Sequence, residues 1–287
     1  YVRLSIENFN VNRVLPVIYN LSLSDVKFIE KYRKKTYTVG KDTNSDYNSF
    51  SKAMLDFGRK ENCTLIVKEG TYNVVDELGS FYFNNYKDRN IHGFQLGGNN
   101  KYIFSSNAKV VFNYDGSNSD VKLSFTPFNS SFMRNPSYIL DGANIEVRNC
   151  RYCIHDDVNF GINYHHIIKN CTMLNHGNDT NGFSQCLGGG LGFSGISEIE
   201  NCSCVSETGN IGISYHGNAG GYTEAKCKTI IKDCYIGGDK TIRIEAYGVS
   251  NLTSEYIITN NSLGSEIIVD DNSNISAKAW NNEIRGN

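Results

Sequence analysis

Hydrophobic and polar positions alternate in short runs along the second half of the chain, and six of these runs end in the same way. Each closes with Asn or Asp and then a small or amide side chain: IEVRNC, HIIKNC, EIENC, TIIKDC, YIITNN and AKAWNN, ending at Cys150, Cys171, Cys202, Cys234, Asn261 and Asn282. The closing residues are 21, 31, 32, 27 and 21 residues apart. Alternation with a period of two indicates strands, and self-similarity every 20–50 residues or so indicates a repeat protein. The pattern therefore predicts a β-solenoid with loops of unequal length.

In such a solenoid each strand pairs with its equivalent in the next coil, so equivalent side chains form columns along the axis. We expect one buried column of polar side chains, formed by Asn149, Asn170, Asn201 and Asp233. A second buried column is expected from the small side chains of Cys150, Cys171, Cys202 and Cys234.

The N-terminal part of the chain has a different pattern. Residues 1–35 are predicted to be a connector or the end of a preceding domain, and residues 36–287 the solenoid. Within the solenoid, 36–78 form the N-terminal cap and first coil, 79–144 irregular early coils with long loops, and 145–287 regular coils. Apolar residues at helical spacing behind Ser49 predict a helix over about Ser49–Arg59, with Ser49 as its N-cap. A solenoid end exposes core and unpaired strand, which such a helix covers.

The order of strand, Asp-rich turn, S-F-x-K-A helix at Ser49–Ala53 and E-G-T-Y at Glu69–Tyr72 resembles the first segment of right-handed parallel β-helices of the pectate-lyase superfamily. With the YVRLSI segment upstream, the chain most resembles such domains in bacteriophage and prophage tail proteins of the tailspike type. The resemblance implies an all-β fold, a single-stranded right-handed parallel β-helix (a pectin-lyase-like solenoid) with an N-terminal capping helix. It does not fix a reaction, because this fold hosts lyases, hydrolases, esterases and binding proteins.

Composition and charge limit the classes of partner and the environment expected for this protein. The net charge of −2 and a pI of about 6.3 favour neither nucleic acid nor an anionic membrane as partner, and no apolar run is long enough for membrane insertion. Nine cysteines, an odd number at repeat positions, argue against a disulfide framework. Glycosylation sequons at Asn170 and Asn201 fall in the expected core, and the chain starts at Tyr1, so we expect an excised or processed bacterial or phage protein, extracellular or in a virion tail.

A second set of strand-like segments, CIHDD, CLGGG, SYHG and RIEAYG, aligns in the same manner. Each places an apolar residue before one of His155, Gly188, His216 and Glu245. Because strand side chains alternate between faces, these four residues are expected to form one outward column. Two residues earlier, Cys153, Cys186, Ser214 and Arg243 are expected on the same outer face.

This outer face carries the candidate chemistry. Glycosidases use two carboxyl groups about 5–9.5 Å apart, for which Asp157 and Glu245 are candidates. Elimination from a uronic acid uses a base and a cation, for which His216 and Arg243 are candidates. The predicted catalytic residues are thus Asp157, Glu245, His216 and Arg243, and the predicted substrate-binding residues are His155, Gly188, Gly189, Gly190, Ser214 and Tyr247. The three glycines are expected to leave an open gap in which a sugar approaches the backbone.

In chain order, HDD, YHG and RIE resemble the GDD, GHG and RIK motifs of polygalacturonases. The match is incomplete: no N-T-D precedes Asp156, and Glu245 stands where that family has Lys. Polygalacturonase activity is therefore not assigned. A further column, five residues after each closing residue, contains His155, His176, Glu207, Asp239 and Glu266 and is the alternative location for a cation. No cofactor and no metal ligands are predicted, and Ca²⁺ has no supporting motif.

The leading hypothesis is a phage or prophage tail appendage that binds, and in one version cleaves, a bacterial surface polysaccharide. The alternative is a stand-alone secreted polysaccharide lyase or glycoside hydrolase, and whether the protein is an enzyme stays open. Aromatic residues in loop-like stretches, Phe81, Tyr82, Phe83, Tyr86 and Phe94, then Phe125, Phe128 and Phe132, are candidates for sugar stacking or for contacts within a parallel homotrimer. Other tail or cell-surface proteins are expected to attach at the N-terminal side.

Overall fold

The computed structural model describes residues 35–79, 92–113, 126–130, 135–156, 163–177, 185–191, 195–207, 211–217, 225–245 and 252–286. The chain divides into two compact units, residues 1–35 and 36–287, of which the first lies outside the described residues except for Lys35. The aromatic residues predicted at 81–86, Phe125 and Phe132 also lie outside them.

The described strands form three parallel sheets, named A, B and C in the order in which the chain visits them. Sheet A contains β1 (Thr36–Val39), β2 (Thr64–Val67), β5 (Asn100–Phe104), β8 (Tyr138–Asp141), β11 (Tyr164–Lys169), β14 (Gly195–Glu200), β17 (Ala225–Lys232), β20 (Leu252–Thr259) and β23 (Ile275–Trp280). Sheet B contains β3 (Gly70–Asn73), β6 (Ala108–Asn113), β9 (Asn144–Arg148), β12 (Thr172–Asn175), β15 (Ser203–Ser206), β18 (Tyr235–Gly237), β21 (Ser262–Leu263) and β24 (Glu283–Ile284). Sheet C contains β4 (His92–Gln95), β7 (Thr126–Asn129), β10 (Tyr152–His155), β13 (Gln185–Leu191), β16 (Ile211–Gly217), β19 (Lys240–Glu245) and β22 (Ile267–Val269).

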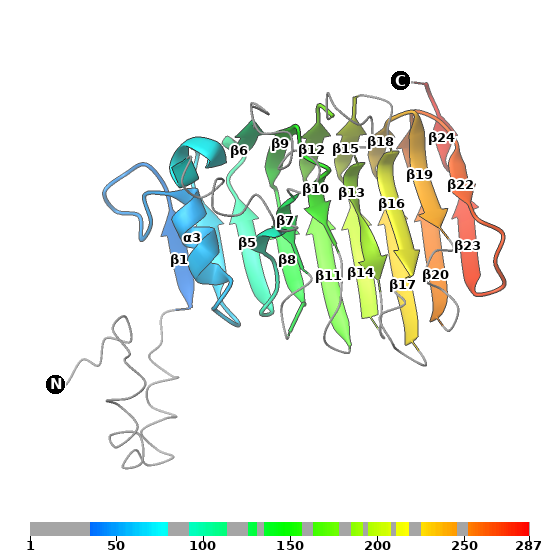
Figure 1. Cartoon of the computed structure of the whole chain (residues 1–287), viewed down its shortest axis with the longest axis horizontal. Helices are drawn as coiled ribbons and strands as arrows, with labels where there is room; N and C mark the ends of the chain where they lie inside the picture. Colours follow the sequence, from blue (N-terminus) through cyan, green and yellow to red (C-terminus); the bar gives the residue numbers. More distant parts are fainter. Residues whose placement is uncertain are drawn as a thin grey trace, which may run out of the picture. The chain divides into compact units, whose positions relative to one another are not determined.

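One strand from each sheet makes one coil, and each strand pairs with its equivalent in the next coil (Figure 1). The predicted fold class, an all-β right-handed parallel β-helix with an N-terminal capping helix, is confirmed. Apolar columns fill the interior. In sheet A one such column runs through Leu65, Tyr102, Leu140, Ile168, Ile199, Ile231 and Ile258, each paired with the next and each buried. These columns exclude water along the axis and supply most of the hydrophobic stabilisation.

The predicted polar column exists, but it lies on the surface. At the corner between sheets A and B, Asn170, Asn201, Asp233, Asn260 and Asn281 all have positive φ, from 50° to 57°, and all are exposed. The expectation of a buried Asn column is therefore wrong at these positions. Asn and Asp tolerate the left-handed conformation that the sharp corner requires, and this conformation turns their side chains outward.

The repeat pattern predicts the wrong corner of the coil for Asn149 and Cys150, the closing residues of the first repeat. Asn149 and Cys150 follow β9 and lie between sheets B and C, whereas the register pairs Lys169 with Asp141. The residues that correspond to Asn170 and Cys171 are therefore Gly142 and Ala143. The error arose because both corners use an Asn with positive φ.

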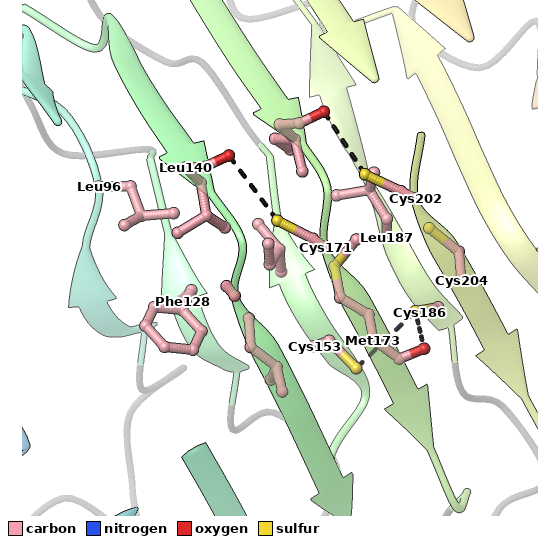
Figure 2. Close-up of a cluster of buried hydrophobic side chains, with 14 of the residues drawn as sticks. Leu96, Phe128, Leu140, Cys153, Cys171, Met173, Cys186, Leu187, Cys202 and Cys204 are labelled. Carbon is pink, nitrogen blue, oxygen red and sulfur yellow. Dashed lines mark hydrogen bonds between the residues drawn. The ribbon is translucent and has the colours of Figure 1, made fainter. Parts of the chain in front are cut away.

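The buried cysteine column contains Cys171, Cys202 and Cys234, at most 3% exposed, and Asn261 continues it. The Cys171 and Cys202 thiols donate to the carbonyls of Leu140 and Ile168 in the preceding coil (Figure 2). All nine cysteines are buried and none forms a disulfide, and burial raises the pKa of thiols such as Cys150 well above its ordinary value.

The N-terminal end of the core is covered by α3 (Phe50–Phe57), close to the predicted helix. Ser49 is the N-cap, and its Oγ accepts from the backbone N–H of Lys52 at 3.3 Å. Phe50 packs against Phe94 and Phe128, with ring centroids 5.9 and 6.2 Å away, so these two aromatic residues belong to the core and not to a loop.

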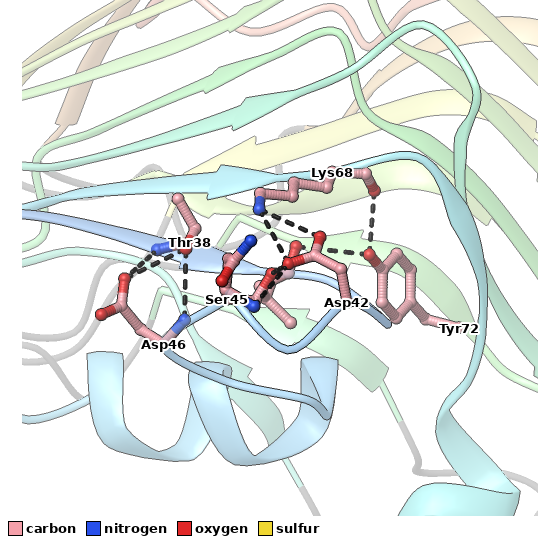
Figure 3. Close-up of polar contacts among 8 residues, drawn as sticks. Thr38, Asp42, Ser45, Asp46, Lys68 and Tyr72 are labelled. Carbon is pink, nitrogen blue, oxygen red and sulfur yellow. Dashed lines mark hydrogen bonds and ion pairs between the residues drawn. The ribbon is translucent and has the colours of Figure 1, made fainter.

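The turn before α3 is fixed by polar contacts. The Lys68 Nζ forms an ion pair with Asp42 at 3.0 Å. The Lys68 carbonyl accepts a hydrogen bond from the Tyr72 hydroxyl at 2.9 Å (Figure 3). Asp46 accepts from the Thr38 backbone N–H at 2.8 Å. A short helical turn at residues 74–79 follows β3. Among the described residues, no helix has the length and apolar character to span a bilayer.

Candidate functional site

One row of equivalent positions runs along sheet C. Strand register places Gln95, Asn129, His155, Gly188, Ser214 and Arg243 next to one another on successive coils, about 4.8 Å apart. Four of these were predicted to share an outer face. Gln95, His155 and Arg243 are partly exposed, whereas Asn129 and Ser214 are buried and Gly188 has no side chain.

The predicted column itself had an incorrect register. His216 pairs with Gly190 on one side and with Glu245 on the other, whereas Gly188 pairs with Ser214. The strand register therefore forms two adjacent columns of paired positions, His155–Gly188–Ser214–Arg243 and Gly190–His216–Glu245. The alignment failed because Ile213 and Tyr215 are both apolar and both buried, so that the sequence offers two equivalent inward positions.

The placement of Cys153 and Cys186 on the outer face is also wrong. Both are fully buried, with their sulfur atoms 3.9 Å apart, and the Cys186 thiol donates to the Met173 carbonyl at 3.3 Å (Figure 2). Strict alternation breaks at the start of β10, where Cys153 and Ile154 are both buried.

His155 is held by its neighbours on the face. Its ring stacks on Tyr152 with centroids 4.6 Å apart, and its Nδ1 lies 3.1 Å from the Asn129 Nδ2. The guanidinium of Arg151 lies 5.1 Å from the centroid of the Tyr152 ring. An imidazole fixed by a stacked ring and an amide is pre-oriented for a hydrogen bond to a ligand.

At the other end of the row, Arg243 and Glu245 form an ion pair of 3.1 Å, with side chains 31% and 26% exposed. The Ser214 Oγ lies 3.5 Å from the second carboxylate oxygen of Glu245, at the limit of a hydrogen bond. The Nε of Arg243 is buried, and no described residue accepts from it.

The open gap expected at the glycines is not present at two of the three. A Cβ at Gly188 would lie 2.5 Å from the Gln185 Oε1, so that side chain occupies the space above the glycine. Gly189 lies at an inward position with φ +157°, where a Cβ would lie 2.5 Å from the Asp156 carbonyl oxygen. Gly190 lies beside His216.

Directly behind the face lies a buried carboxylate. The Asp156 side chain is fully buried and contacts His166 Nδ1 at 2.6 Å, Tyr138 Oη at 3.0 Å, Tyr215 Oη at 3.1 Å, Ser197 Oγ at 3.1 Å and Ser130 Oγ at 3.3 Å. Burial acts to raise the pKa of Asp156, but the charge of His166 and the hydrogen bonds from the tyrosines outweigh it and lower the pKa. Burial and the charge of Asp156 raise the pKa of Tyr138 and Tyr215 well above the ordinary value.

This network links sheet C to sheet A under the outward residues. Asp156 belongs to the HDD segment, whose resemblance to a polygalacturonase motif implied an exposed carboxylate. The structure turns Asp156 into the core, where it contacts protein groups and not the outer face. Sequence reasoning missed the network, since its members come from six different strands or strand ends and no local motif joins them.

Two predicted site residues, Asp157 and Tyr247, lie outside the described residues. His216 is placed by strand register, next to Gly190 and Glu245. Among the described strands of sheet C, Glu245 is the one carboxylate, and it is paired with Arg243.

The predicted cation column is divided between sheets. His176 lies at the end of β12 between two carboxylates, 3.0 Å from Glu146 and 2.7 Å from Glu207, whereas His155 belongs to sheet C. Lys109 pairs with Glu146. In the described part of the chain, no cluster of three or more His, Cys, Asp or Glu has an arrangement that holds a metal ion.

No protein-family model matches the chain, and no curated protein matches it. Two solved structures are similar over most of their length. The pectin methylesterase from Aspergillus niger is 10% identical, with a TM-score of 0.36 over 87% of each chain. Pectate lyase Pel9A is 12% identical, with a TM-score of 0.39 over 88% of this chain and 79% of that one. Similarity this distant carries no information about activity, and the fold assignment rests on the sheet topology itself.

Proposed function

We propose that this protein binds a polysaccharide along the outer face of sheet C. The observation that carries the proposal is that the strand register aligns three partly exposed polar residues, His155, Arg243 and Glu245, on one face of sheet C. A rigid row of hydrogen-bonding groups at regular spacing suits an extended polymer with repeating hydroxyl groups. Pre-oriented groups also lower the entropic cost of binding.

Binding is favoured over cleavage by the number of carboxyl groups. Glycosidases use a pair of them, whereas Glu245 is the one carboxylate in the described strands of sheet C and is engaged by Arg243 at 3.1 Å. The alternative, a secreted polysaccharide lyase or hydrolase, is supported by the strand register, which pairs the position of His216 with that of Glu245, the ion-pair partner of Arg243.

The biological setting proposed for this binding is a phage or prophage tail appendage that engages a bacterial cell-surface polysaccharide. Its support is the resemblance of the N-terminal segment to tail-protein β-helices. In this setting the protein is a parallel homotrimer, extracellular or on the virion, and other tail or surface proteins attach at the N-terminal side. Light scattering tests the assembly: a mass of one chain in solution excludes the trimer for this chain.

The test of binding is titration calorimetry with purified capsular, lipopolysaccharide and wall glycans, using Arg243→Ala and His155→Ala. Hydrogen bonds to charged groups contribute about 1.5–3 kcal/mol, so we expect Arg243→Ala to weaken binding roughly tenfold or more. Lys101→Ala, on the outer face of sheet A, is the control and leaves affinity unchanged.

Reducing-end and unsaturated-product assays on the same glycans separate the two functions. A protein that only binds releases no product from any glycan to which it binds. Turnover that Glu245→Gln abolishes while binding persists establishes the enzyme instead. Unchanged affinity in both Arg243→Ala and His155→Ala would exclude this face as the binding site.

A further inference from the structure

A second polar row follows the corner between sheets A and B, on a different face from the row in sheet C. Asn170 donates its Nδ2 to the Asp141 Oδ1 at 2.8 Å, and Asn201 donates its Nδ2 to the Asn170 Oδ1 at 2.8 Å. Asn170 thus donates to the preceding coil and accepts from the next. The row has a direction, and it continues only while the next residue can donate.

The next position in the row is Asp233, because Glu200 pairs with Lys232 and Ser203 with Tyr235. An ionised carboxylate has no proton to donate. The Oδ1 of Asn201 and the carboxylate of Asp233 are therefore two acceptors on adjacent coils, and no described residue donates a side-chain hydrogen bond to either. The row ends at a place that needs donors from outside the chain.

This place lies in a surface hollow of about 330 Å³, lined by Asn170, Thr172, Asn201, Ser203, Asp233 and Tyr235. Thr172, Ser203 and Tyr235 are paired neighbours in sheet B, so two hydroxyls lie in line with the phenol ring. The Tyr235 side chain is 41% exposed. An exposed aromatic ring beside polar groups is the arrangement on which a sugar ring stacks.

The charge of the hollow distinguishes between ligands. Lys232 is paired with Glu200 at 3.0 Å, and Lys169 is paired with Asp141 at 3.3 Å. Neither lysine forms an ion pair with Asp233 among the described residues, although the charge of Asp233 helps, after that of Glu200, to raise the pKa of Lys232. The carboxylate therefore has a cation nearby but, among the described residues, no side-chain donor in contact with it. A cationic donor satisfies both acceptors, since an ammonium group carries three N–H bonds and a positive charge.

We propose that this hollow binds a saccharide unit that carries a protonated amino group. The ammonium donates to Asn201 Oδ1 and to the Asp233 carboxylate, the sugar hydroxyls reach Thr172 and Ser203, and the ring lies against Tyr235. The proposal does not rest on the function assigned to sheet C, because the two faces share no residue.

The test is calorimetry at pH 5.5 with a glucosamine hexamer and with the N-acetylglucosamine hexamer as its uncharged match. We expect the glucosamine hexamer to bind at least about tenfold more tightly, with an affinity that falls as salt rises. Asp233→Asn removes the charge and supplies a donor to Asn201, so this variant should fold normally and lose at least about tenfold in affinity. Asp271→Asn, which removes the same charge from an exposed position in another loop, should leave binding unchanged.

Tyr235→Ala tests the contact between the phenol ring and the sugar ring. It should weaken binding of the glucosamine hexamer and any residual binding of the N-acetylglucosamine hexamer to the same extent. Equal affinity for the two hexamers, or full affinity in Asp233→Asn, would overturn the proposal. Loss of binding in Arg243→Ala but not in Asp233→Asn would assign the amino sugar to sheet C and reject the hollow. Binding that survives Arg243→Ala and is lost in Asp233→Asn supports the hollow whatever the sheet C experiments show.

Discussion

The Nδ1 of His166 lies 2.6 Å from the Oδ1 of Asp156, and both side chains are fully buried between sheets A and C. Burial acts to raise the pKa of the carboxyl group, yet the imidazole and the two tyrosine hydroxyls hold it below its ordinary value of 3.8. Asp156 is therefore ionised in the folded protein at neutral pH. A buried charge of this kind is tolerated only with its full set of partners.

This relationship predicts an acid-sensitive contribution to stability. A carboxyl group with a lowered pKa in the folded state stabilises that state at pH values above its unfolded pKa, here near 3.8. The contribution disappears as the pH falls from there through the lower, folded pKa. The melting temperature of the natural chain, followed by circular dichroism between pH 7 and 2.5, should drop in this window.

Asp156→Asn isolates this pH-dependent contribution to stability, because the variant has no carboxyl group to titrate. Removing one partner of a buried pair destabilises by about 3–5 kcal/mol, so the variant should melt well below the natural chain at pH 7. The difference between the two should shrink toward pH 3. A constant difference across the pH range would show that Asp156 acts through packing and not through its charge.

A second, weaker pH effect is expected around Glu146. The Lys109 ion pair, with a smaller contribution from His176, lowers the pKa of Glu146 below 4.5. Because the group is partly exposed, solvent limits the stabilisation to about 1 kcal/mol or less. Lys109→Met should lower the melting temperature slightly at pH 7 and low salt, and the effect should vanish at 1 M salt and below pH 4. A salt-independent loss would indicate that the aliphatic part of Lys109 is what matters.

The coil architecture could be predicted from sequence because the interior columns are apolar over many coils. Leu140, Ile168 and Ile199 occupy the same inward position in successive strands, and their spacing in the chain reveals the repeat. Which corner of the coil each Asn occupies could not be predicted. Asn149 and Asn170 have nearly the same φ, 58° and 56°, although they turn the chain between different pairs of sheets. The local sequence specifies that the chain bends, but only the strand pairing specifies which two sheets the bend connects.

The candidate site shows a related limit. The outward face of sheet C follows from alternation, so His155 and Arg243 were found. The inward turn of Asp156 depends on Tyr138, His166 and Tyr215, which lie up to 59 residues away in the chain. A polar residue at a strand end is usually exposed, and only its distant partners make burial favourable.

The surface position of Asn170 changes what a substitution there should do. For a buried residue the loss would come from unsatisfied partners, but Asn170 is exposed with φ 56°, so the backbone conformation dominates. Asn170→Leu should cost about 1–2 kcal/mol, because side chains other than Asn, Asp and Gly are strained in the left-handed region. Asn170→Gly removes the same amide yet relieves the strain, and it should be less destabilising. Denaturant unfolding of both variants measures the difference, and equal losses would assign the effect to the amide hydrogen bonds.

The last prediction concerns Gly189, which separates the outer face from the buried Asp156 network. At φ +157°, an added Cβ would lie 2.5 Å from the Asp156 carbonyl oxygen and 2.6 Å from its carbonyl carbon. Backbone atoms cannot move aside, so Gly189→Ala must displace β13 from β10 and should cost more than about 3 kcal/mol, as overpacking and backbone strain combine.

Gly79→Ala is the matched control, since Gly79 also has a positive φ, +71°, but an added Cβ would meet no atom of the described residues within 4 Å. Backbone conformation alone should then cost about 1–2 kcal/mol. Urea unfolding of the two variants gives the comparison directly. Because β13 lies between His155 and Ser214, Gly189→Ala should also weaken glycan binding at sheet C in the fraction that stays folded. Equal losses of stability in the two variants would show that β13 and β10 do not approach each other as closely as the structure requires.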